Sequence, residues 1–447
     1  MNKFDSYKDS GIQWVDKIPL SWDTKKLKFL GIIYSGLTGK KGDDFGDEDN
    51  PKSKPYIPYT NIFNNTQISK NHFDYVVLEK DEKQNLVKKN DLFVLMSSEN
   101  YEDLGKTSIL IDDCEELYLN SFCKGFRTTK ENINPNFINY QLLGHLHRLL
   151  ISVEGSGFTR INLRQDKLLN TPILVTDLEE QNKIVDYLDK KVNQIDELIK
   201  KIEQKIDLLK EKRITLINEV VTKGLNPNVE MKNSDIDWIG EIPSHWDVKK
   251  LKYLSKITPS SVNKNIFDDE IQVSVCNYTH VYYNNFINTK VNLDVGSCTE
   301  NEFLKFKLYK DDVIITKDSE TPDDIGIPTL VSESLENTVC GYHLTIIRPE
   351  GIKGGFLFRF ILSENTRRYF EINSNGVTRY GLGKPSVENL VILLPPEEEQ
   401  EQIITYLGHE IQIIDDSIST EQKRFELLKE YKQSLISEVV TGKKRVV

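Results

Sequence analysis

Two stretches of this 447-residue chain repeat apolar side chains every seven residues, and no other feature constrains the fold as strongly. In residues 178–222 one seam position holds Leu188, Ile195, Ile202, Leu209 and Leu216, and the other holds Val192, Ile199, Ile206 and Val220. The same frame recurs in residues 397–441, with Leu407, Ile414, Leu428 and Leu435, then Ile411, Ile418, Phe425 and Val439. A strict heptad of this length favours a coiled coil over a surface helix with an apolar stripe, because a 3.6-residue period would drift out of frame.

Polar residues interrupt these seams at only a few positions. Arg213 is the break in the first stretch, and Glu421 and Lys432 are the breaks in the second. Two such helices in one chain can pair with each other. Each would be roughly 65 Å long at 1.5 Å per residue, so the pair predicts a rod that holds two other objects apart.

The rest of the chain is duplicated as well. A W-x-x-x-I-P-x-x-W segment stands at Trp14–Trp22 and again at Trp238–Trp246. All four tryptophans of the chain lie in these two segments. We interpret them as packing staples, because the proline ends an extended piece and the tryptophan anchors the start of the next segment.

Two strand-rich modules come after these openings, and their loops differ. Residues 56–63 and 272–279 each predict a strand that runs into a polar, aromatic loop. Residues 91–96 and 311–316 predict buried strands, each followed by a polar loop. The candidate binding residues in these loops are Tyr59, Asn61, Ser98 and Asn100 in the first module and Asn277, Tyr278 and Lys317 in the second.

Similarity returns before each long helix. Helices are predicted at 137–153 and 356–372, and strands at 171–175 and 390–396. Between them stand the loops Gly157-Phe-Thr159-Arg160-Ile-Asn162 and Gly376-Val-Thr378-Arg379. Thr and Arg donate to phosphate, and Arg can also fork onto a guanine edge. The candidate binding residues here are Thr159, Arg160, Asn162, Thr378 and Arg379, although the arginine could instead fix the loop to its module or to the helix pair.

Composition limits the remaining possibilities. The net charge of −11 argues against nucleic-acid binding when taken alone, but it does not exclude local basic patches or a positive partner subunit. The chain has no apolar run long enough for a membrane span and no signal-peptide pattern. Its five cysteines form no CxxC pair, so we expect no zinc site, no disulfide framework and a cytoplasmic location.

Catalytic signatures are weak throughout. His145-x-His147 lacks a third metal ligand, so no metal site is predicted. The segment from Gly36 to Gly42 lacks the spacing of a phosphate loop and predicts a flexible loop. Asn134-Pro-Asn-Phe137 differs by one residue from the N-P-P-F motif of adenine methyltransferases, and no Gly-rich cofactor loop precedes it. We therefore predict no catalytic residue in the chain.

These patterns predict an α+β chain with a pseudo-twofold internal repeat. Two strand-rich globular modules would be separated by two long antiparallel coiled-coil helices. The predicted segments are 1–176 and 225–395 for the first and second recognition modules, and 177–224 and 396–447 for the central and C-terminal helices.

The duplicated W-x-x-x-I-P-x-x-W openings, the GxTR loops and the P-x-x-E-Q-x-x-I-like openings of the long helices together resemble the specificity subunit of type I restriction-modification systems. The resemblance covers nearly the whole chain and both repeats. One departure is local, since the first long helix lacks the Leu-Pro-Pro that stands at 394–396.

The resemblance implies that each module is a target recognition domain that reads half of a bipartite double-stranded DNA site, with the helix pair as a spacer. Two methyltransferase subunits would dock on the chain and carry S-adenosylmethionine, and restriction subunits would use ATP; this chain would bind neither cofactor. Two alternatives are a coiled-coil adaptor that reads no sequence, and a stand-alone DNA methyltransferase or nuclease.

Overall fold

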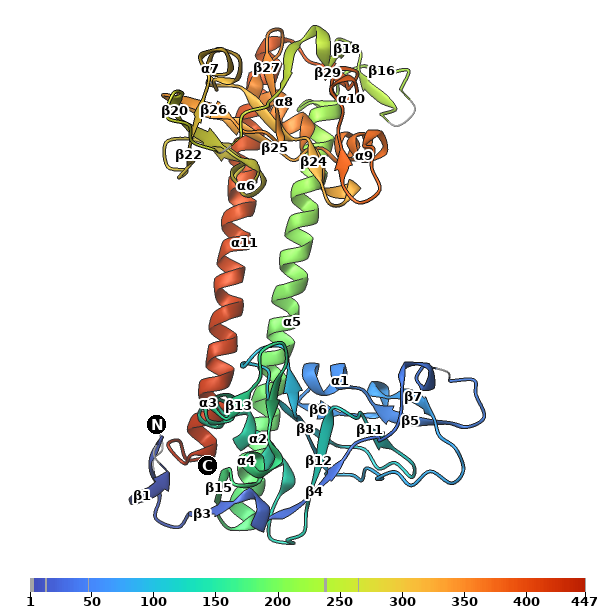
Figure 1. Ribbon diagram of the computed structural model, residues 1–447, viewed down its shortest axis with the longest axis vertical. Coiled ribbons are helices and arrows are strands. Elements are labelled where there is room, and N and C mark those ends of the chain that lie inside the picture. The colour runs from blue at the N-terminus through green and yellow to red at the C-terminus, as the bar shows by residue number, and fades with distance from the viewer. Residues whose placement is uncertain (1–3, 13, 47, 237–238, 264, 447) are drawn as a thin grey trace. The chain divides into compact units, whose positions relative to one another are not determined.

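The computed structural model describes residues 4–12, 14–46, 48–236, 239–263 and 265–446. Its contacts divide the chain into unit 1, residues 1–203 with 423–447, and unit 2, residues 204–422. Each unit contains one strand-rich lobe and part of both long helices, α5 (Leu178–Lys223) and α11 (Glu397–Val440) (Figure 1). The predicted α+β class, with its internal repeat and two long helices, is confirmed. The four predicted segments (1–176, 177–224, 225–395 and 396–447) separate the modules from the long helices, whereas the two units divide each helix between them. The boundaries of the four segments stay a prediction.

The predicted seams are the buried faces of α5 and α11. In unit 1 the seam residues Leu188, Val192 and Ile195 share one apolar cluster with Leu435 and Val439. In unit 2 the cluster contains the seam residues Val220 and Leu407, and Leu216 and Ile411 pack against it. The first turns of one helix therefore pack with the last turns of the other in each unit, which is an antiparallel arrangement.

The polar breaks in the seams pair with opposite charges on the other helix. In unit 2 Lys205 lies 2.7 Å from Glu421, and Arg213 lies 3.2 Å from Asp415. In unit 1 Lys432 lies 2.7 Å from Asp196. The Arg213–Asp415 and Lys432–Asp196 bridges are equivalent in the two repeats. Asp196 corresponds to Asp415, and Arg213 corresponds to Lys432. Charged residues at seam positions specify register, so these bridges favour one alignment of the helices.

The lobe of unit 1 is built on a mixed sheet in the order β4-β12-β8-β10-β6, in which only β6 and β10 run parallel. A smaller sheet has the order β11-β5-β7. The bounds are β4 (Gly31–Ser35), β12 (Cys123–Thr128), β8 (Leu92–Leu95), β10 (Thr107–Leu110), β6 (Gln67–Ile68), β11 (Tyr118–Leu119), β5 (Ser53–Ile57) and β7 (Asp74–Val77). Shorter pairings join β1 (Tyr7–Ile12) to β2 (Val15–Pro19) and β3 (Asp23–Lys26) to β15 (Pro172–Val175).

The lobe of unit 2 repeats this topology with the orders β19-β27-β23-β25-β21 and β22-β20-β26. The bounds are β19 (Ser255–Pro259), β27 (Leu344–Pro349), β23 (Val313–Thr316), β25 (Pro328–Val331), β21 (Phe286–Ile287), β22 (Asp294–Cys298), β20 (Ile271–Cys276) and β26 (Thr338–Cys340). Further pairs join β16 (Met231–Asn233) to β17 (Glu241–Pro243) and β18 (Asp247–Lys250) to β29 (Val391–Leu394). The buried strands predicted at 91–96 and 311–316 correspond to β8 and β23.

The shorter helices correct two predictions. The helix predicted at 137–153 is broken at Gly144, whose extended backbone separates α2 (Pro135–Leu143) from α3 (His145–Val153). The helix predicted at 356–372 is α8 (Gly354–Ile361) and α9 (Glu364–Asn373), because the Ser363 hydroxyl caps a new helix start. The loops predicted after 57 and 276 contain the short helices α1 (Tyr59–Asn64) and α6 (Tyr278–Tyr283). The remaining helices are α4 (Gln165–Leu169), α7 (Glu300–Phe306) and α10 (Lys384–Glu388).

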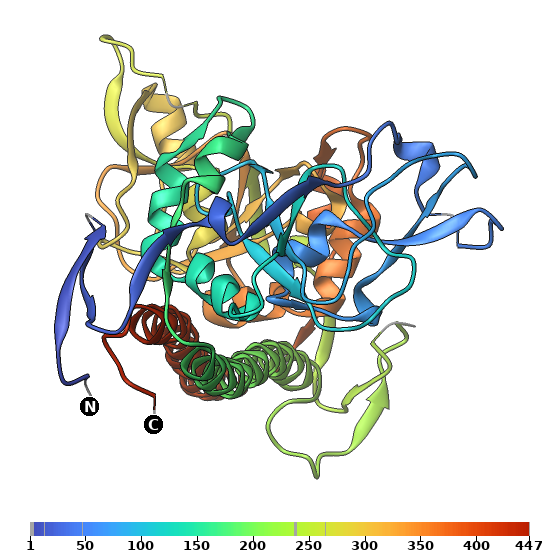
Figure 2. The same cartoon turned by 90° about the horizontal axis from the view of Figure 1, so that it is seen from below.

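Each lobe is fastened to the start of a long helix by a repeated clamp. The buried indole of Trp22 donates to Glu180 at 3.0 Å, and that of Trp246 donates to Glu399 at 3.0 Å. This confirms the packing role predicted for Trp22 and Trp246. Trp14 is 37% exposed, so the prediction is wrong for that residue, and Trp238 lies outside the described residues. The amino- and carboxyl-terminal segments lie side by side in unit 1 (Figure 2), where the Tyr7 hydroxyl donates to the Gly442 carbonyl at 3.2 Å.

A buried ion pair is also repeated inside the sheets. The guanidinium of Arg127 forks onto Asp91 at 2.8 and 2.6 Å, and that of Arg348 forks onto Asp312 at 2.8 Å for both contacts. Both aspartates are 1% exposed. The hydrogen bond to its aspartate raises the pKa of each arginine. Each pair ties the central strand of its sheet to the neighbouring strand.

We predict that Asp91→Asn lowers the stability of unit 1 by about 3 kcal/mol, because it leaves Arg127 beside a buried neutral group. Asp166→Asn, which removes an exposed ion pair with Arg164, should change stability by less than about 0.5 kcal/mol. Denaturant unfolding of the full chain, followed by tryptophan fluorescence, measures both. Equal effects of the two substitutions would contradict a structural role for the Asp91 pair.

Candidate nucleic-acid interface

Each GxTR loop is the turn of a short hairpin held against its lobe. In unit 1 the hairpin strands are β13 (Gly155–Ser156) and β14 (Ile161–Leu163), and β14 also pairs with β9 (Ser97–Ser98). In unit 2 β28 (Tyr380–Gly381) pairs with β24 (Asp318–Ser319). The chain thus brings the GxTR loop beside the polar loop that comes after β8 or β23, although the two loops are far apart in sequence.

Gly157 and Gly376 make this turn possible. Their φ angles are +141° and +157°, and a Cβ atom on either would stand 2.0 Å from the carbonyl oxygen of Arg160 or Arg379. Only glycine fits so close an approach of backbone to backbone. The glycine three residues before the arginine therefore fixes where the arginine leaves the hairpin.

In unit 1 four of the predicted residues line one open pocket of about 530 Å³. Tyr59, Ser98, Asn100 and Arg160 all contribute to its wall. Six further residues complete the lining: Phe63, Ser97, Glu99, Asp103, Asn120 and Phe122. The lining thus offers hydroxyl, amide and guanidinium groups beside aromatic rings.

The donors and acceptors of this pocket are partly held in place. The Tyr59 hydroxyl donates to the Ser97 carbonyl at 3.0 Å, and the Asn100 amide donates to Asp103 at 2.6 Å. Burial raises the pKa of Tyr59, although the nearby Ser98 and Arg160 act in the opposite direction. The hydroxyl therefore stays protonated at neutral pH and can serve as a hydrogen-bond donor.

In unit 2 the predicted Lys317 and Arg379 belong to one polar cluster. Asp318 accepts from Lys317 at 2.9 Å and lies 2.7 Å from the His343 ring. Desolvation opposes the charge of Asp318, but the hydrogen bonds from His343 and Lys317 prevail and lower its pKa. A guanidinium nitrogen of Arg379 lies 3.4 Å from both ring nitrogens of His343. Equal distances place that nitrogen over the ring rather than in line with one lone pair.

The two arginines therefore share one setting, in which an aromatic ring supports the guanidinium. The Arg160 guanidinium lies 5.1 Å from the centre of the Phe122 ring, and Arg379 lies over His343. Phe122 and His343 each stand five residues before the arginine of the buried ion pair, Arg127 or Arg348. Sequence reasoning missed both rings, and an aromatic residue at this fixed distance was the signal that could have identified them.

The tyrosines of α1 and α6 are equivalent as well. Tyr59 and Tyr278 begin these helices and occupy the same position of the two repeats. Burial raises the pKa of Tyr278, while Ser319 and Arg379 oppose the rise, just as Ser98 and Arg160 do for Tyr59. The Tyr278 ring also stacks on Tyr282, with centroids 5.7 Å apart. Each unit thus combines a tyrosine, a serine, an arginine and a supporting ring.

Other predicted residues lie outside these two clusters. The Asn61 amide donates to the His72 carbonyl at 2.7 Å, and the Asn277 amide donates to Asp294 at 2.6 Å, so both side chains hold local structure. The Asn162 amide donates to the Arg160 carbonyl at 3.2 Å and braces the turn. Thr159 and Thr378 are exposed on the turns themselves.

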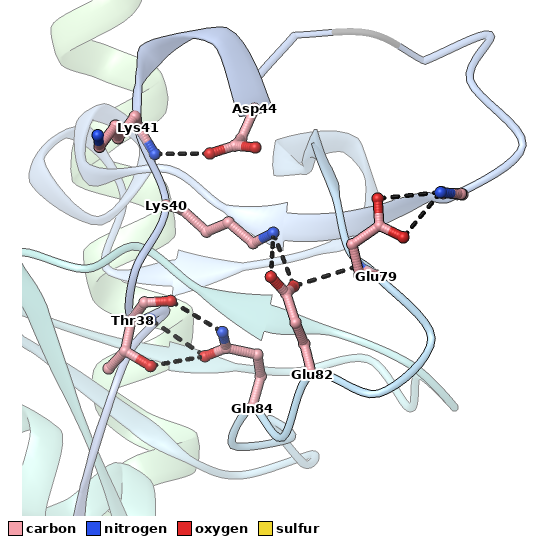
Figure 3. Close-up of polar contacts among 8 residues, drawn as sticks. Thr38, Lys40, Lys41, Asp44, Glu79, Glu82 and Gln84 are labelled. Carbon is pink, nitrogen blue, oxygen red and sulfur yellow. Dashed lines mark hydrogen bonds and ion pairs between the residues drawn. The ribbon is translucent and has the colours of Figure 1, made fainter.

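The loop from Gly36 to Gly42 is fastened to its lobe rather than free (Figure 3). The Gln84 amide accepts from the Thr38 backbone at 3.0 Å and donates to the Thr38 carbonyl at 2.9 Å. The ammonium group of Lys40 lies 2.6 Å from Glu82, and its side chain is 5% exposed. The lysine that would contact phosphate in a nucleotide loop is thus paired, which corrects the prediction of a flexible loop.

The predicted His145-x-His147 pair lies at the start of α3. His147 is buried, its Nε2 lies 2.8 Å from the Pro172 carbonyl, and burial lowers its pKa. Within the described residues, no three His, Cys, Asp or Glu side chains are placed to hold a metal ion. No helix of the described chain is both long and apolar enough to cross a membrane.

One protein-family model matches both repeats of the chain. The family model described as "Type I restriction modification DNA specificity domain" matches residues 19–208 and again 243–429. The two matches together cover well over half of the chain, and each contains one GxTR hairpin. The protein belongs to the type I restriction-modification DNA specificity family, whose members are the DNA-recognition subunits of these systems.

Individual relatives agree along nearly the whole chain. The putative MjaX specificity subunit of Methanocaldococcus jannaschii is 26% identical over 97% of this chain and 96% of its own length. The EcoKI specificity subunit of Escherichia coli K12 is 24% identical over 87% of this chain and 82% of its own.

Solved structures share the fold. One chain, from a study of complex assembly and conformational transition of the type I R-M system, has a TM-score of 0.71 at 15% identity, covering 96% of this chain and 99% of its own. The HsdS subunit of Thermoanaerobacter tengcongensis has a TM-score of 0.52 at 15% identity, covering 96% and 98%.

Proposed function

We propose that each lobe reads one half of a bipartite double-stranded DNA site through its arginine, tyrosine and serine cluster. The observation that carries this proposal is the ring-supported arginine at the same place in both units, Arg160 over Phe122 and Arg379 over His343. An arginine that packs on a ring keeps its guanidinium oriented. Two N–H donors of the guanidinium can then bind the two acceptors of guanine, or two oxygens of a phosphate group.

The polar neighbours of the two arginines differ, which suits two different half-sites. Around Arg160 they are Asn100 and Ser98, and an asparagine amide can pair with adenine. Around Arg379 they are Asp318 and Lys317, and a carboxylate can accept from the amino group of cytosine. The scaffold is thus the same in both lobes, while the groups that would face the bases are not.

The helix pair would act as the spacer between the half-sites and as a docking platform. Two methyltransferase subunits would bind the chain and supply S-adenosylmethionine and the adenine methylation, and restriction subunits would use ATP. Partner subunits would also contribute phosphate contacts, which accounts for DNA binding by a complex whose recognition chain has a net charge of −11. The complex would work in the cytoplasm, where its DNA substrate lies.

A coiled-coil adaptor without sequence reading is the rival explanation. It would make the lobes interchangeable supports, and the base specificity of the complex would then belong to another subunit. Exchange of one lobe separates the two explanations.

We predict that replacing Gly31–Leu163 with the corresponding block of a specificity subunit of known target changes only one half of the methylated site. This block carries β4 together with its partner β12, so the sheet is exchanged intact. Sequencing of methylated bases in cells that carry the chimera and its methyltransferase subunits measures the site. The matched exchange of Ser255–Leu382 should change the other half.

An unchanged site after both exchanges would refute sequence reading by these lobes. A change in both halves after a single exchange would refute the division of labour between them.

We also predict that one heptad inserted after Ile202 together with one after Glu421 lengthens the unread spacer by about three base pairs. Seven helical residues add about 10 Å, and one base pair of B-DNA takes about 3.4 Å. The two positions lie near each other on the pair, because Glu421 bridges to Lys205. A single insertion should abolish methylation, since it separates Arg213 from Asp415 or Lys432 from Asp196. An unchanged spacer in the double insertion would refute the spacer role.

A further inference from the structure

The tip of each GxTR hairpin carries a fully solvent-exposed apolar side chain. Phe158 is 108% exposed and Val377 is 90% exposed, and the two residues occupy the same position of the two repeats. Each stands between a glycine and the Thr-Arg pair of its turn. Each tip therefore places an apolar side chain directly beside the hydrogen-bond donors of its Thr-Arg pair, at the same place in both repeats.

The turn prevents these side chains from being part of the lobe core. The close approach of Gly157 to the Arg160 carbonyl, and of Gly376 to the Arg379 carbonyl, forces residues 158 and 377 to the outside of the turn. Two residues after each tip, the arginine packs on its ring, Arg160 on Phe122 and Arg379 on His343. Each hairpin therefore presents an apolar tip immediately beside a fixed hydrogen-bond donor.

We propose that Phe158 and Val377 are wedges that insert between base pairs, one in each half-site. This proposal rests on the proposed function, since it places DNA against the two clusters. Apolar side chains that enter a base step unstack it and kink the duplex, and polar donors beside them hold the distorted backbone. The Thr159–Arg160 and Thr378–Arg379 pairs supply such donors within the same turn.

The two tips differ in a way that suits DNA better than a shared protein partner. Phenylalanine has a flat ring that stacks on a base, whereas valine is short and branched, so the two would distort unlike half-sites to different extents. A second pair of exposed apolar side chains lies outside the GxTR turns, near the ends of α3 and α9. Val153 is 83% exposed and Ile372 is 81% exposed, and the two residues also occupy equivalent positions of the repeats. These two are alike in shape and provide matched control positions.

The test uses the full chain assembled with methyltransferase subunits and a duplex that contains the site found by methylation sequencing. 2-Aminopurine replaces one non-methylated base at a time, and its fluorescence rises where stacking is lost. With the native chain we expect a rise at one step in each half-site. Phe158→Ala should abolish the rise in the first half-site and weaken binding about tenfold. Val377→Ala should abolish the rise in the second half-site with a smaller loss of binding, about threefold.

Matched variants separate insertion from other effects. Phe158→Leu should keep most of the affinity, because an apolar wedge remains. Val153→Ala and Ile372→Ala should leave both the fluorescence and the affinity unchanged. All four substituted side chains are exposed, so the unfolding midpoints should match that of the native chain.

Three results would overturn the proposal. The first is the absence of a fluorescence rise at every non-methylated position, and the second is native affinity in Phe158→Ala. The third is loss of a methyltransferase subunit from the Phe158→Ala complex in solution, which would assign the tip to protein docking. Arg160→Ala distinguishes the two proposals: weakened binding in this variant, with native binding in Phe158→Ala, refutes the wedge alone. Native binding in both variants refutes the proposed function together with it.

Discussion

The structure depends on a hydrogen bond that closes each end of the helix pair. A buried tryptophan indole, from Trp22 in unit 1 and Trp246 in unit 2, donates to a glutamate in the first turn of a long helix. The last turn of the other helix reaches the same place, since Gly442 lies beside Trp22 and Gly224 beside Trp246. A neutral donor of this kind can accompany a carboxylate into a partly buried site, where the hydrogen bond offsets part of the cost of desolvation. The start of one helix, the end of the other and the first strands of a lobe thus meet at one point in each unit.

This construction explains why the framework is repeated while the loops differ. The seam residues, the paired charges at Asp196–Lys432 and Asp415–Arg213, and the buried aspartate–arginine pairs hold the backbone without touching the binding loops. The loops after β8 and β23 can therefore change residue by residue with little effect on the fold. What stays the same beside these loops is the support of the GxTR arginine on a ring, with Arg160 on Phe122 and Arg379 on His343. The proposed wedge adds the apolar tip of the same hairpin, so that a single turn would both distort DNA and contact it.

The sequence predicted the framework well because its signals are periodic or duplicated. The heptads located both long helices almost to their observed ends, and the duplicated segment predicted the packing role of Trp22 and Trp246. The sequence predicted the breaks in helices less well, because Gly144 and Ser363 act through local backbone conformation that an apolar pattern does not register.

The site was predicted only in part. Tyr59, Ser98, Asn100 and Arg160 do converge, but the rings of Phe122 and His343 come from segments beside strands whose register no local pattern specifies. Asn61 and Asn277 donate to nearby groups of the same lobe, as loop asparagines often do.

The most direct test of this helix pairing is amide hydrogen exchange, followed by mass spectrometry, on the full chain and on a chain that ends at Gln422. Residues 423–447 complete the core of unit 1, through Leu435 and Val439 among others, and belong to no part of unit 2. We therefore expect truncation to remove protection from residues 134–203 and from the strands around Trp22, while residues 224–400 keep theirs. Loss of protection in unit 2 instead, or no loss in unit 1, would contradict the pairing of each helix start with the end of the other helix.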